Sequence, residues 1–295
     1  MEALKLSNYR AIDQFACTEF FATGFDNTRL HIVSWMPEAI PRAIIMLVHG
    51  SGDHILRYNH WARFFNDERI GFIGLDIRGH GKSGGKRGHG TLSDVFKDID
   101  LLINYAKEKY PKIPRILYGQ SMGGNLVMSY VIARKPNING LVSTSPWLRL
   151  VNPPSDFFRK IGKMLAKLTP SIALSNGLNS KNLTDDELVI KSYENDPLVH
   201  DKISPQLLLE VLETGDSLLQ NRHRFNVPLL VLHGTHDKIA SWRACAEFSK
   251  YTSKNTCFKS WEGGYHELHN NYDKEDVFGY IANWIDQLPF SRHLN

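Results

Sequence analysis

Residues 117–124 read Leu-Tyr-Gly-Gln-Ser-Met-Gly-Gly, a turn flanked by two different secondary-structure patterns. The short, mostly apolar run 115–118 before the turn is typical of a strand. After it, residues 125–133 repeat apolar side chains at helical spacing. The turn itself has the pattern Gly-x-Ser-x-Gly, which is typical of a nucleophile elbow. We therefore expect Ser121 to stand on a sharp turn between a strand and a helix.

The two glycines of this turn have a physical role. A serine in a tight strand-to-helix turn crowds its neighbours two positions away, so Gly119 and Gly123 must lack a Cβ atom. An ordinary strand–helix loop with a chance serine would show the same five letters. The flanking strand and helix favour the nucleophile elbow over that alternative.

The overall composition is that of a globular protein. The chain has 295 residues, of which 42% are hydrophobic and 22% are charged. This length suits one large or two modest domains. A formal net charge of +4 is too small to indicate nucleic-acid binding, so no nucleic-acid partner is predicted.

The cysteines and the N-terminal residues bear on the cellular compartment. Cys17, Cys245 and Cys257 are odd in number and far apart, which indicates neither a disulfide framework nor a metal site. Residues 1–18 lack a basic segment followed by an apolar one, and no apolar run is long enough to cross a bilayer. We expect a cytoplasmic protein in a reducing compartment, without a metal or another cofactor.

Apolar runs alternate with helical patterns through most of the chain. Strands are expected at 16–21, 30–35, 43–48, 71–77, 115–118, 140–143, 227–232 and 256–261, the first two as a hairpin. Helical patterns separate most of the later strands. The alternation predicts an α/β fold with a mostly parallel eight-stranded sheet and helices on both faces.

Between residue 147 and about residue 225 this alternation stops, and helical patterns continue without a clear buried strand. The simplest account is a helical cap inserted after a sheet strand. It would lie over the carboxyl ends of the strands, where open α/β sheets bind their ligands. We therefore expect a first core part at 1–146, a cap insertion at 147–225 and a second core part at 226–295.

The glycine-rich stretch 79–84 matches two nucleotide-binding patterns, and both are rejected. A dinucleotide-binding loop would open a helix at once, whereas further glycines follow and no helical pattern begins before Leu92. A phosphate-binding loop would need a glycine where Asp76 stands. We interpret the stretch as a structural loop beside the active site.

A serine hydroxyl needs a base to take its proton and an anion to orient that base. In elbow-containing folds the acid and then the histidine follow the serine in the chain. Asp237 follows the expected strand 227–232 within a turn, and we assign it as the acid. His266 follows the strand 256–261 and a flexible Gly-Gly pair, and we assign it as the base. His269, three residues later, is either a pocket polar group or a surface histidine.

Acyl transfer also needs donors for the negative oxygen of the tetrahedral intermediate. The backbone N–H of Met122, at the start of the expected helix, is one candidate. The backbone N–H of Ser51, in the loop after the strand 43–48, is the other.

With these residues assigned, the chain resembles the α/β-hydrolases, and in particular the monoacylglycerol lipase and lysophospholipase group. The resemblance covers nearly the whole chain. It is carried by HGSGDH at 49–54 with the following Arg57 and Tyr58, GHGKS at 79–83, GQSMGG at 119–124, YENDPL at 193–198, Asp237 and YHELH at 265–269. It implies a serine esterase with an α/β-hydrolase fold, a helical cap and an elongated apolar acyl pocket.

The resemblance also bears on the head group of the substrate. Asp53, Arg57 and His269 stand near the expected oxyanion residue and base, and similar positions in the group are associated with glycerol recognition. Tyr193 is suggested as a cap residue that faces the head group, although it can equally be a packing tyrosine. The group often has alanine at 51, glutamate at 53 and histidine at 120. Asp53 and Arg57 can also simply pair to brace their loop.

One expected cap helix has two contrasting faces. Its apolar residues are Phe157, Phe158, Ile161, Met164, Leu165 and Leu168, and its basic residues are Arg159, Lys160, Lys163 and Lys167. Such a helix can lie on a membrane surface and admit lipid, which would make the protein peripheral to a membrane. It can equally pack its apolar face on the core.

The leading interpretation is a serine carboxylic-ester hydrolase that acts on a small-molecule lipid monoester, either monoacylglycerol or lysophospholipid, through an acyl-enzyme on Ser121. A peptidase or amidase on the same triad is a second reading, and it would need cap acids such as those at 185–187 to face a substrate amine. A ligand-binding receptor that retains the triad is a third. Dehalogenase and epoxide hydrolase chemistry is disfavoured because it requires a carboxylate where Ser121 stands.

Overall fold

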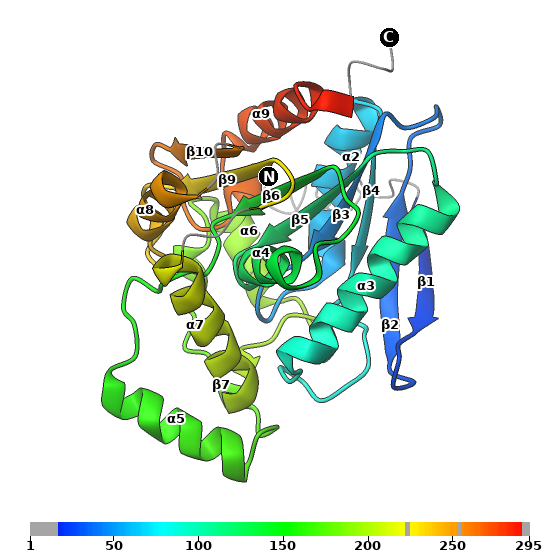
Figure 1. Cartoon of the computed structure of the whole chain (residues 1–295). Helices are drawn as coiled ribbons and strands as arrows, with labels where there is room; N and C mark the ends of the chain where they lie inside the picture. The colour runs from blue at the N-terminus through cyan, green and yellow to red at the C-terminus, as the bar shows by residue number, and fades with distance from the viewer. Residues whose placement is uncertain (1–16, 222–224, 253–254, 291–295) are drawn as a thin grey trace, which may run out of the picture.

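The computed structural model describes residues 17–221, 225–252 and 255–290. Its main sheet has the strand order β1-β2-β4-β3-β5-β6-β9-β10 (Figure 1). The strands are β1 (Thr18–Thr23), β2 (Arg29–Trp35), β3 (Ala43–Val48), β4 (Ile70–Leu75), β5 (Arg115–Gln120), β6 (Gly140–Thr144), β9 (Leu229–Gly234) and β10 (Thr256–Trp261). β2 pairs antiparallel with β1 and β4, and the other pairs are parallel. The predicted mostly parallel eight-stranded sheet is confirmed. Ala16, the first residue of the strand expected at 16–21, lies outside the described residues.

Helices cover both faces of this sheet (Figure 1). They are α2 (Asn59–Asp67), α3 (Leu92–Lys109), α4 (Met122–Arg134), α8 (Trp242–Tyr251) and α9 (Lys274–Asp286), with short 3-10 turns η1 (Ile55–Tyr58) and η3 (Leu268–Asn270). α2 and α9 pack together on one face, and α3 and α4 lie on the other.

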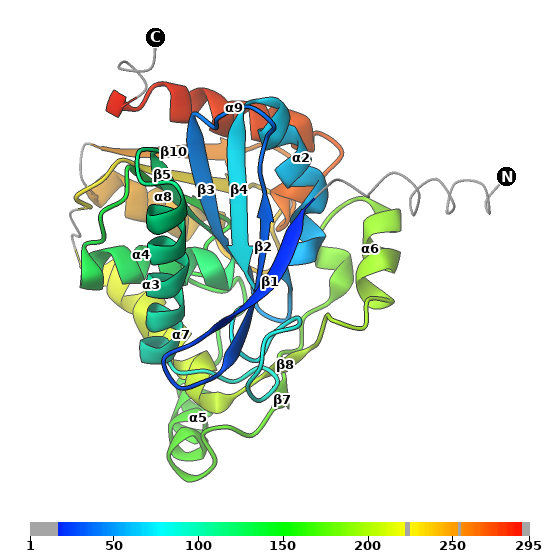
Figure 2. The same ribbon diagram turned by 90° about the vertical axis from the view of Figure 1, so that its right-hand side faces the viewer.

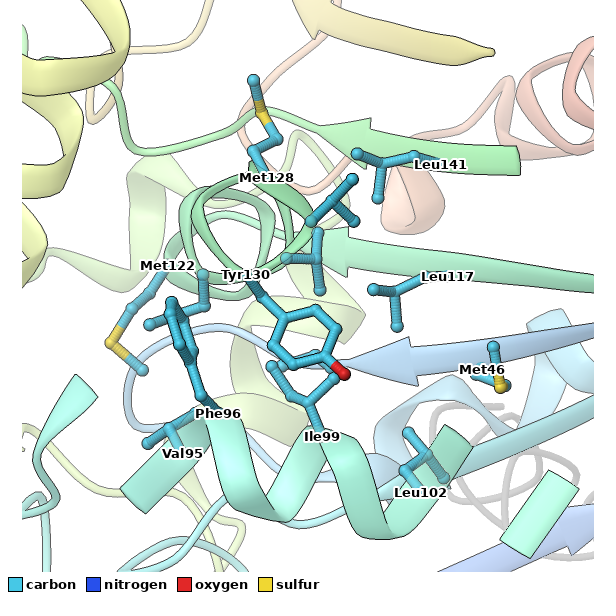
Figure 3. Packing of buried hydrophobic residues seen from close by; sticks show 14 of the residues in the cluster. Met46, Val95, Phe96, Ile99, Leu102, Leu117, Met122, Met128, Tyr130 and Leu141 are labelled. Atoms are coloured by element: carbon cyan, nitrogen blue, oxygen red, sulfur yellow. The ribbon is translucent and has the colours of Figure 1, made fainter. Parts of the chain in front are cut away.

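Strand β3 shows why the central strands read as continuous apolar runs. Its residues are all buried, and they alternate between the two hydrophobic cores. Met46 points into the core beneath α3 and α4, together with Leu117, Ile99 and Tyr130 (Figure 3). Leu47 belongs to the core beneath α2 and α9. A strand buried on both faces can place its functional groups only at its ends.

The chain between β6 and β9 forms a separate helical layer. It contains α5 (Asp156–Leu168), η2 (Ser180–Asn182), α6 (Glu187–Glu194) and α7 (Pro205–Gln220), with a small antiparallel pair of β7 (Leu174–Ser175) and β8 (Lys202–Ile203). α7 packs against α4, and α5 packs against α7 at the edge of the molecule (Figures 1 and 2). We propose that residues 147–225 are the inserted cap.

The cap helix α5 does not pack its apolar face on the core. Phe157, Phe158, Met164 and Leu168 are 53–72% exposed. On the side that meets α7, Arg159 pairs with Asp216, Lys163 pairs with Glu213, and a Cβ atom on Gly162 would lie 3.4 Å from Leu209. The alternative of core packing is therefore wrong for these four residues, although Ile161 and Leu165 are half-buried.

Within the described ranges, no helix is both long and apolar enough to cross a membrane.

Candidate active site

Strand β5, Ser121 and helix α4 form the predicted sharp turn. Ser121 has φ 55° and ψ −117°, a backbone conformation that L-residues rarely adopt. A Cβ atom on Gly119 would lie 2.3 Å from the Gly123 carbonyl oxygen, and one on Gly123 would lie 2.1 Å from the Val48 carbonyl oxygen. Both glycines are therefore needed for steric reasons, and the strained turn presents the Ser121 hydroxyl at the carboxyl end of the sheet.

The structure brings Ser121, His266 and Asp237 into one hydrogen-bonded chain. Ser121 Oγ lies 2.8 Å from His266 Nε2, and His266 Nδ1 lies 2.7 Å from Asp237 Oδ2. Asp237 follows β9 and His266 follows β10, and these two strands are parallel neighbours. All three side chains are buried. We propose Ser121 as the nucleophile, His266 as the base and Asp237 as the acid.

The groups around the Ser121–His266–Asp237 hydrogen bonds determine which atoms carry the protons. His266 Nδ1 faces a carboxylate and therefore carries hydrogen, which leaves Nε2 to accept the Ser121 hydroxyl proton. Burial acts to lower the pKa of His266, but the Asp237 carboxylate outweighs it and the pKa lies above its ordinary value. Burial acts to raise the pKa of Asp237, yet His266 and the hydrogen bonds from His233 and His266 lower it. The acid is therefore a carboxylate at neutral pH, as orienting a base requires.

The loop after β3 lies against the elbow, where the predicted oxyanion donors stand. A Cβ atom on Gly50 would lie 3.3 Å from Ser121 Cβ. Met122 is the first residue of α4, so its N–H stands at a helix N-terminus. The backbone N–H groups of Ser51 and Met122 stay our candidates for the oxyanion hole.

Two side chains not assigned from the sequence shape this loop. The His49 ring donates from Nδ1 to the Gly50 carbonyl at 2.8 Å, and its Nε2 accepts the Ile77 N–H at 2.9 Å. Asp76 Oδ1 accepts the Ile55 N–H at 2.7 Å, and Oδ2 accepts the Lys82 N–H at 2.8 Å. Asp76 thus ties the glycine-rich stretch 79–84 to the loop after β3. Since α3 begins only at Leu92, the structure agrees with a structural loop rather than a nucleotide-binding one.

Asp53 and Arg57 form a buried ion cluster with Glu267, a residue that no sequence pattern singled out. Arg57 Nη1 donates to Asp53 Oδ1 at 2.8 Å and to Glu267 Oε1 at 2.9 Å, and Nη2 donates to Glu267 Oε2 at 2.8 Å. Tyr58 donates its hydroxyl to Asp53 Oδ2 at 2.8 Å. Burial acts to raise the pKa of both carboxyls, but Arg57 lowers each below its ordinary value. Asp53 and Arg57 therefore brace their loop against the loop of the candidate base.

His269 is a buried ring in an aromatic stack. It is 1% exposed, so the alternative of a surface histidine is wrong. Its ring lies 4.7 Å from that of Tyr58 and 5.1 Å from that of Trp61, measured between centroids. Neither ring nitrogen finds a hydrogen-bond partner among the described residues, and burial lowers the pKa of His269 to about 3. The imidazole is neutral in the folded protein.

The cap touches the site through its segment 183–200. The guanidinium of Arg57 lies 4.7 Å from the ring centroid of Tyr193. His54 Nε2 lies 2.9 Å from Asp196 Oδ2, and the His200 N–H donates to the Gly52 carbonyl at 3.0 Å. Asn176, Leu178, Tyr193, Glu194, Asp196, Val199, His200 and Asp201 line a cavity of about 280 Å³ at this contact. Tyr193 is thus placed above the Asp53–Arg57–Glu267 cluster.

The cap acids at 185–187 stand at the start of α6. Asp186 accepts hydrogen bonds from the N–H groups of Leu188 and Val189 and so caps the helix. This role accounts for its carboxylate without a substrate amine.

In the part of the chain that the structure describes, no cluster of His, Cys, Asp and Glu could hold a metal ion.

The fold and the hydrogen-bonded Ser121, His266 and Asp237 define a hydrolase of the α/β-hydrolase class. The chain belongs to the Hydrolase_4 family, described as serine aminopeptidase, S33, which matches residues 39–273.

Two curated proteins and one solved structure illustrate which members of the family this chain is similar to. The chain is 31% identical over 273 residues to a monoacylglycerol lipase of Mycolicibacterium smegmatis, covering 91% of this chain and 96% of that protein. It is 33% identical over 266 residues to an uncharacterized abhydrolase domain-containing protein of Dictyostelium discoideum, covering 89% of this chain but 28% of that protein. Among solved structures, the monoacylglycerol lipase of Paleococcus ferrophilus has 32% identity and a TM-score of 0.80, covering 87% of this chain and 98% of that one. The family and these likenesses make this chain a carboxylic-ester hydrolase.

Proposed function

We propose that this protein hydrolyses lipid monoesters, with monoacylglycerol as the preferred substrate, through an acyl-enzyme on Ser121. The observation that carries the proposal is the hydrogen-bonded chain from Ser121 through His266 to Asp237. The named activities of the Mycolicibacterium smegmatis and Paleococcus ferrophilus proteins support the lipid ester as substrate. We also propose a cytoplasmic location.

The mechanism follows from the geometry. His266 Nε2 takes the hydroxyl proton while Ser121 Oγ bonds to the ester carbonyl carbon, and the carbonyl oxygen becomes negative. The N–H groups of Ser51 and Met122 hold that oxygen. The C–O bond to the alcohol then breaks, His266 returns its proton to the leaving alcohol, and an acyl-Ser121 ester remains. A water molecule, deprotonated by the same imidazole, releases the fatty acid. Asp237 stays ionised throughout and stabilises the imidazolium.

We propose the surface formed by Asp53, Arg57, His269 and Tyr193 as the alcohol-side wall of the substrate pocket. Asp53 and Arg57 already use much of their hydrogen-bonding capacity within the ion cluster. They would contact glycerol hydroxyls through their remaining lone pairs and N–H groups, directly or through water. His269 contributes a neutral ring whose two buried nitrogens have no hydrogen-bond partner among the described residues.

The exposed apolar residues of α5 suggest how the lipid reaches the site. Phe157, Phe158, Met164 and Leu168 are exposed. Their helix, α5, lies at the outer edge of the cap (Figure 2). We propose that these side chains make transient contact with a membrane surface and that the monoester enters beneath the cap.

A substrate panel tests the proposal. The panel contains monoacylglycerols, lysophospholipids, p-nitrophenyl esters of rising chain length and aminoacyl naphthylamides, each with the wild type and with Ser121→Ala. We expect monoacylglycerol turnover that Ser121→Ala reduces by about three or more orders of magnitude. Cleavage of the amides without the esters would make the protein an aminopeptidase. Binding of monoacylglycerol without any turnover would make it a receptor, and either result would overturn the proposal.

A further inference from the structure

Asp237 is hydrogen-bonded to a second imidazole that the mechanism above does not use. His233 lies in β9, four residues before Asp237, and is fully buried. Its Nε2 lies 2.8 Å from Asp237 Oδ2, the same oxygen that lies 2.7 Å from His266 Nδ1. One carboxylate oxygen is therefore shared by the candidate base and by His233.

The contacts of His233 define where its proton is. Nε2 faces Asp237 Oδ2 at 2.8 Å and the Ala240 carbonyl oxygen at 3.2 Å, and both of these atoms are acceptors. Nε2 therefore carries hydrogen whether the ring is neutral or charged. The other carboxylate oxygen, Asp237 Oδ1, accepts the N–H groups of Ile239 at 2.7 Å and Ala240 at 2.9 Å. With both oxygens engaged, the carboxylate cannot turn without losing a hydrogen bond.

Cys245 completes the arrangement from helix α8. Its Sγ lies 3.2 Å from His233 Nδ1, and the residue is fully buried. Burial raises the pKa of the Cys245 thiol well above its ordinary value, so the sulfur keeps its hydrogen. A neutral His233 with hydrogen on Nε2 has its lone pair on Nδ1, and the thiol can donate to it. The thiol thereby favours the tautomer that Asp237 needs.

We propose that His233 is a positioning residue for ester hydrolysis, because its Nε2–H holds the Asp237 carboxylate in the orientation that directs Oδ2 at His266 Nδ1, while the Cys245 thiol fixes the tautomer of His233. The inference rests on the proposed function of Ser121, His266 and Asp237. It concerns only how the acid is oriented, and no covalent step on His233 or Cys245 is involved.

The expected direction of a pH effect follows from the groups that face the base. His266 is faced by Asp237 at Nδ1 and Ser121 at Nε2, and the Glu267 carboxylate acts on it from the adjacent position. Each group that donates a hydrogen bond to the Asp237 carboxylate partly compensates the negative charge of that carboxylate. Removing the His233 donor leaves more of that charge for His266, so the pKa of His266 rises and activity is lost at a higher pH on acidification. The carboxylate is then held only by the two N–H groups at Oδ1 and by His266 itself, so it is oriented less firmly and kcat falls at every pH.

The test compares His233→Leu with His233→Gln, whose amide nitrogen can reach the position of Nε2. For His233→Leu we expect kcat on a p-nitrophenyl ester to fall about tenfold or more with KM nearly unchanged, and the acid limb of the profile to move to higher pH. His233→Gln should recover most of kcat and the wild-type acid limb. His236→Leu, an exposed histidine in the same loop, is the matched control and should behave as wild type. An unchanged His233→Leu, or a His233→Gln as impaired as His233→Leu, would overturn the proposal.

A second pair of variants leaves His233 in place and covers the case in which His233→Leu does not fold. Cys245→Ser keeps a donor to Nδ1 and should retain more kcat than Cys245→Ala. Equal activity of the two would remove the thiol from the proposal. The rate at which a fluorophosphonate labels Ser121, followed against pH, repeats every comparison without a substrate. If the wild type labels but hydrolyses no ester, the proposed function fails, whereas the labelling rates still decide the role of His233.

Discussion

Replacing Arg57 by alanine tests the buried ion cluster most severely. The side chains of Arg57, Asp53 and Glu267 are 9%, 4% and 4% exposed, and one guanidinium serves two carboxylates. Arg57→Ala leaves both carboxylates buried without their cation. Breaking a buried pair in this way costs about 3–5 kcal/mol, well above the roughly 0–1 kcal/mol of an exposed pair. We therefore expect Arg57→Ala to lower the free energy of unfolding by about 3–5 kcal/mol at neutral pH.

The assay is urea unfolding of four proteins, which are the wild type, Arg57→Ala, Glu267→Gln and the double variant. Glu267→Gln removes one of the two carboxylate charges that Arg57 leaves behind, so the double variant should lose less than the sum of the single losses, by about 1–3 kcal/mol. Arg159→Ala is the matched control, since Arg159 pairs with Asp216 at 27% and 34% exposure. If Arg57→Ala cost no more than Arg159→Ala, or if the losses simply added, the cluster would not brace the two loops.

Four further predictions concern the elbow, the base, the buried carboxylates and the cap. Gly123→Ala should abolish ester hydrolysis and lower Tm, because its Cβ would meet the Val48 carbonyl oxygen at 2.1 Å; retained activity would contradict the elbow geometry. The acid limb of kcat/KM should have its midpoint above the ordinary histidine value of 6.5, and Asp237→Asn should lower that midpoint along with the rate. The pKa values of Asp53 and Glu267 are lowered by folding, so their stabilisation is present above their ordinary values of 3.8 and 4.5 and is lost as the pH falls further; a midpoint in urea that did not decrease on acidification below about pH 4.5 would contradict this. Phe157→Ser with Phe158→Ser should reduce co-sedimentation with phosphatidylcholine vesicles while leaving hydrolysis of a soluble short-chain ester unchanged; equal binding by wild type and variant would place the lipid contact elsewhere.

The sheet could be predicted from the sequence because its central strands are buried on both faces. β3 is an unbroken apolar run and was expected at the residues that the structure shows. β10 was likewise expected at Thr256–Trp261, whereas β9 begins at Leu229 rather than Val227. The two-residue strands β7 and β8 are too short to carry a periodic pattern. No expectation covered α8, although Ser241 caps it and Ala244, Cys245 and Phe248 recur at helical spacing.

In the site, the residues that lie close to a recognisable turn or strand end could be assigned. Ser121, Asp237 and His266 each follow a strand, and the structure brings them together. Glu267 could not be assigned, because its partner Arg57 is 210 residues away and no local pattern connects them. The fate of the α5 apolar face was also open, since a helical pattern does not say which neighbour a face meets. In the structure, the side of α5 that carries Arg159 and Lys163 meets α7, and Phe157, Phe158, Met164 and Leu168 stay exposed.

The most direct test of the central claim is to map the serine that forms the covalent intermediate. The wild-type protein and Ser121→Ala are treated with a fluorophosphonate, and the adduct is located by intact mass and peptide mapping. The account predicts one adduct per chain, on Ser121, with ester hydrolysis lost in step with labelling and no adduct on Ser121→Ala. An adduct on another serine, or hydrolysis that continues after Ser121 is fully labelled, would contradict it.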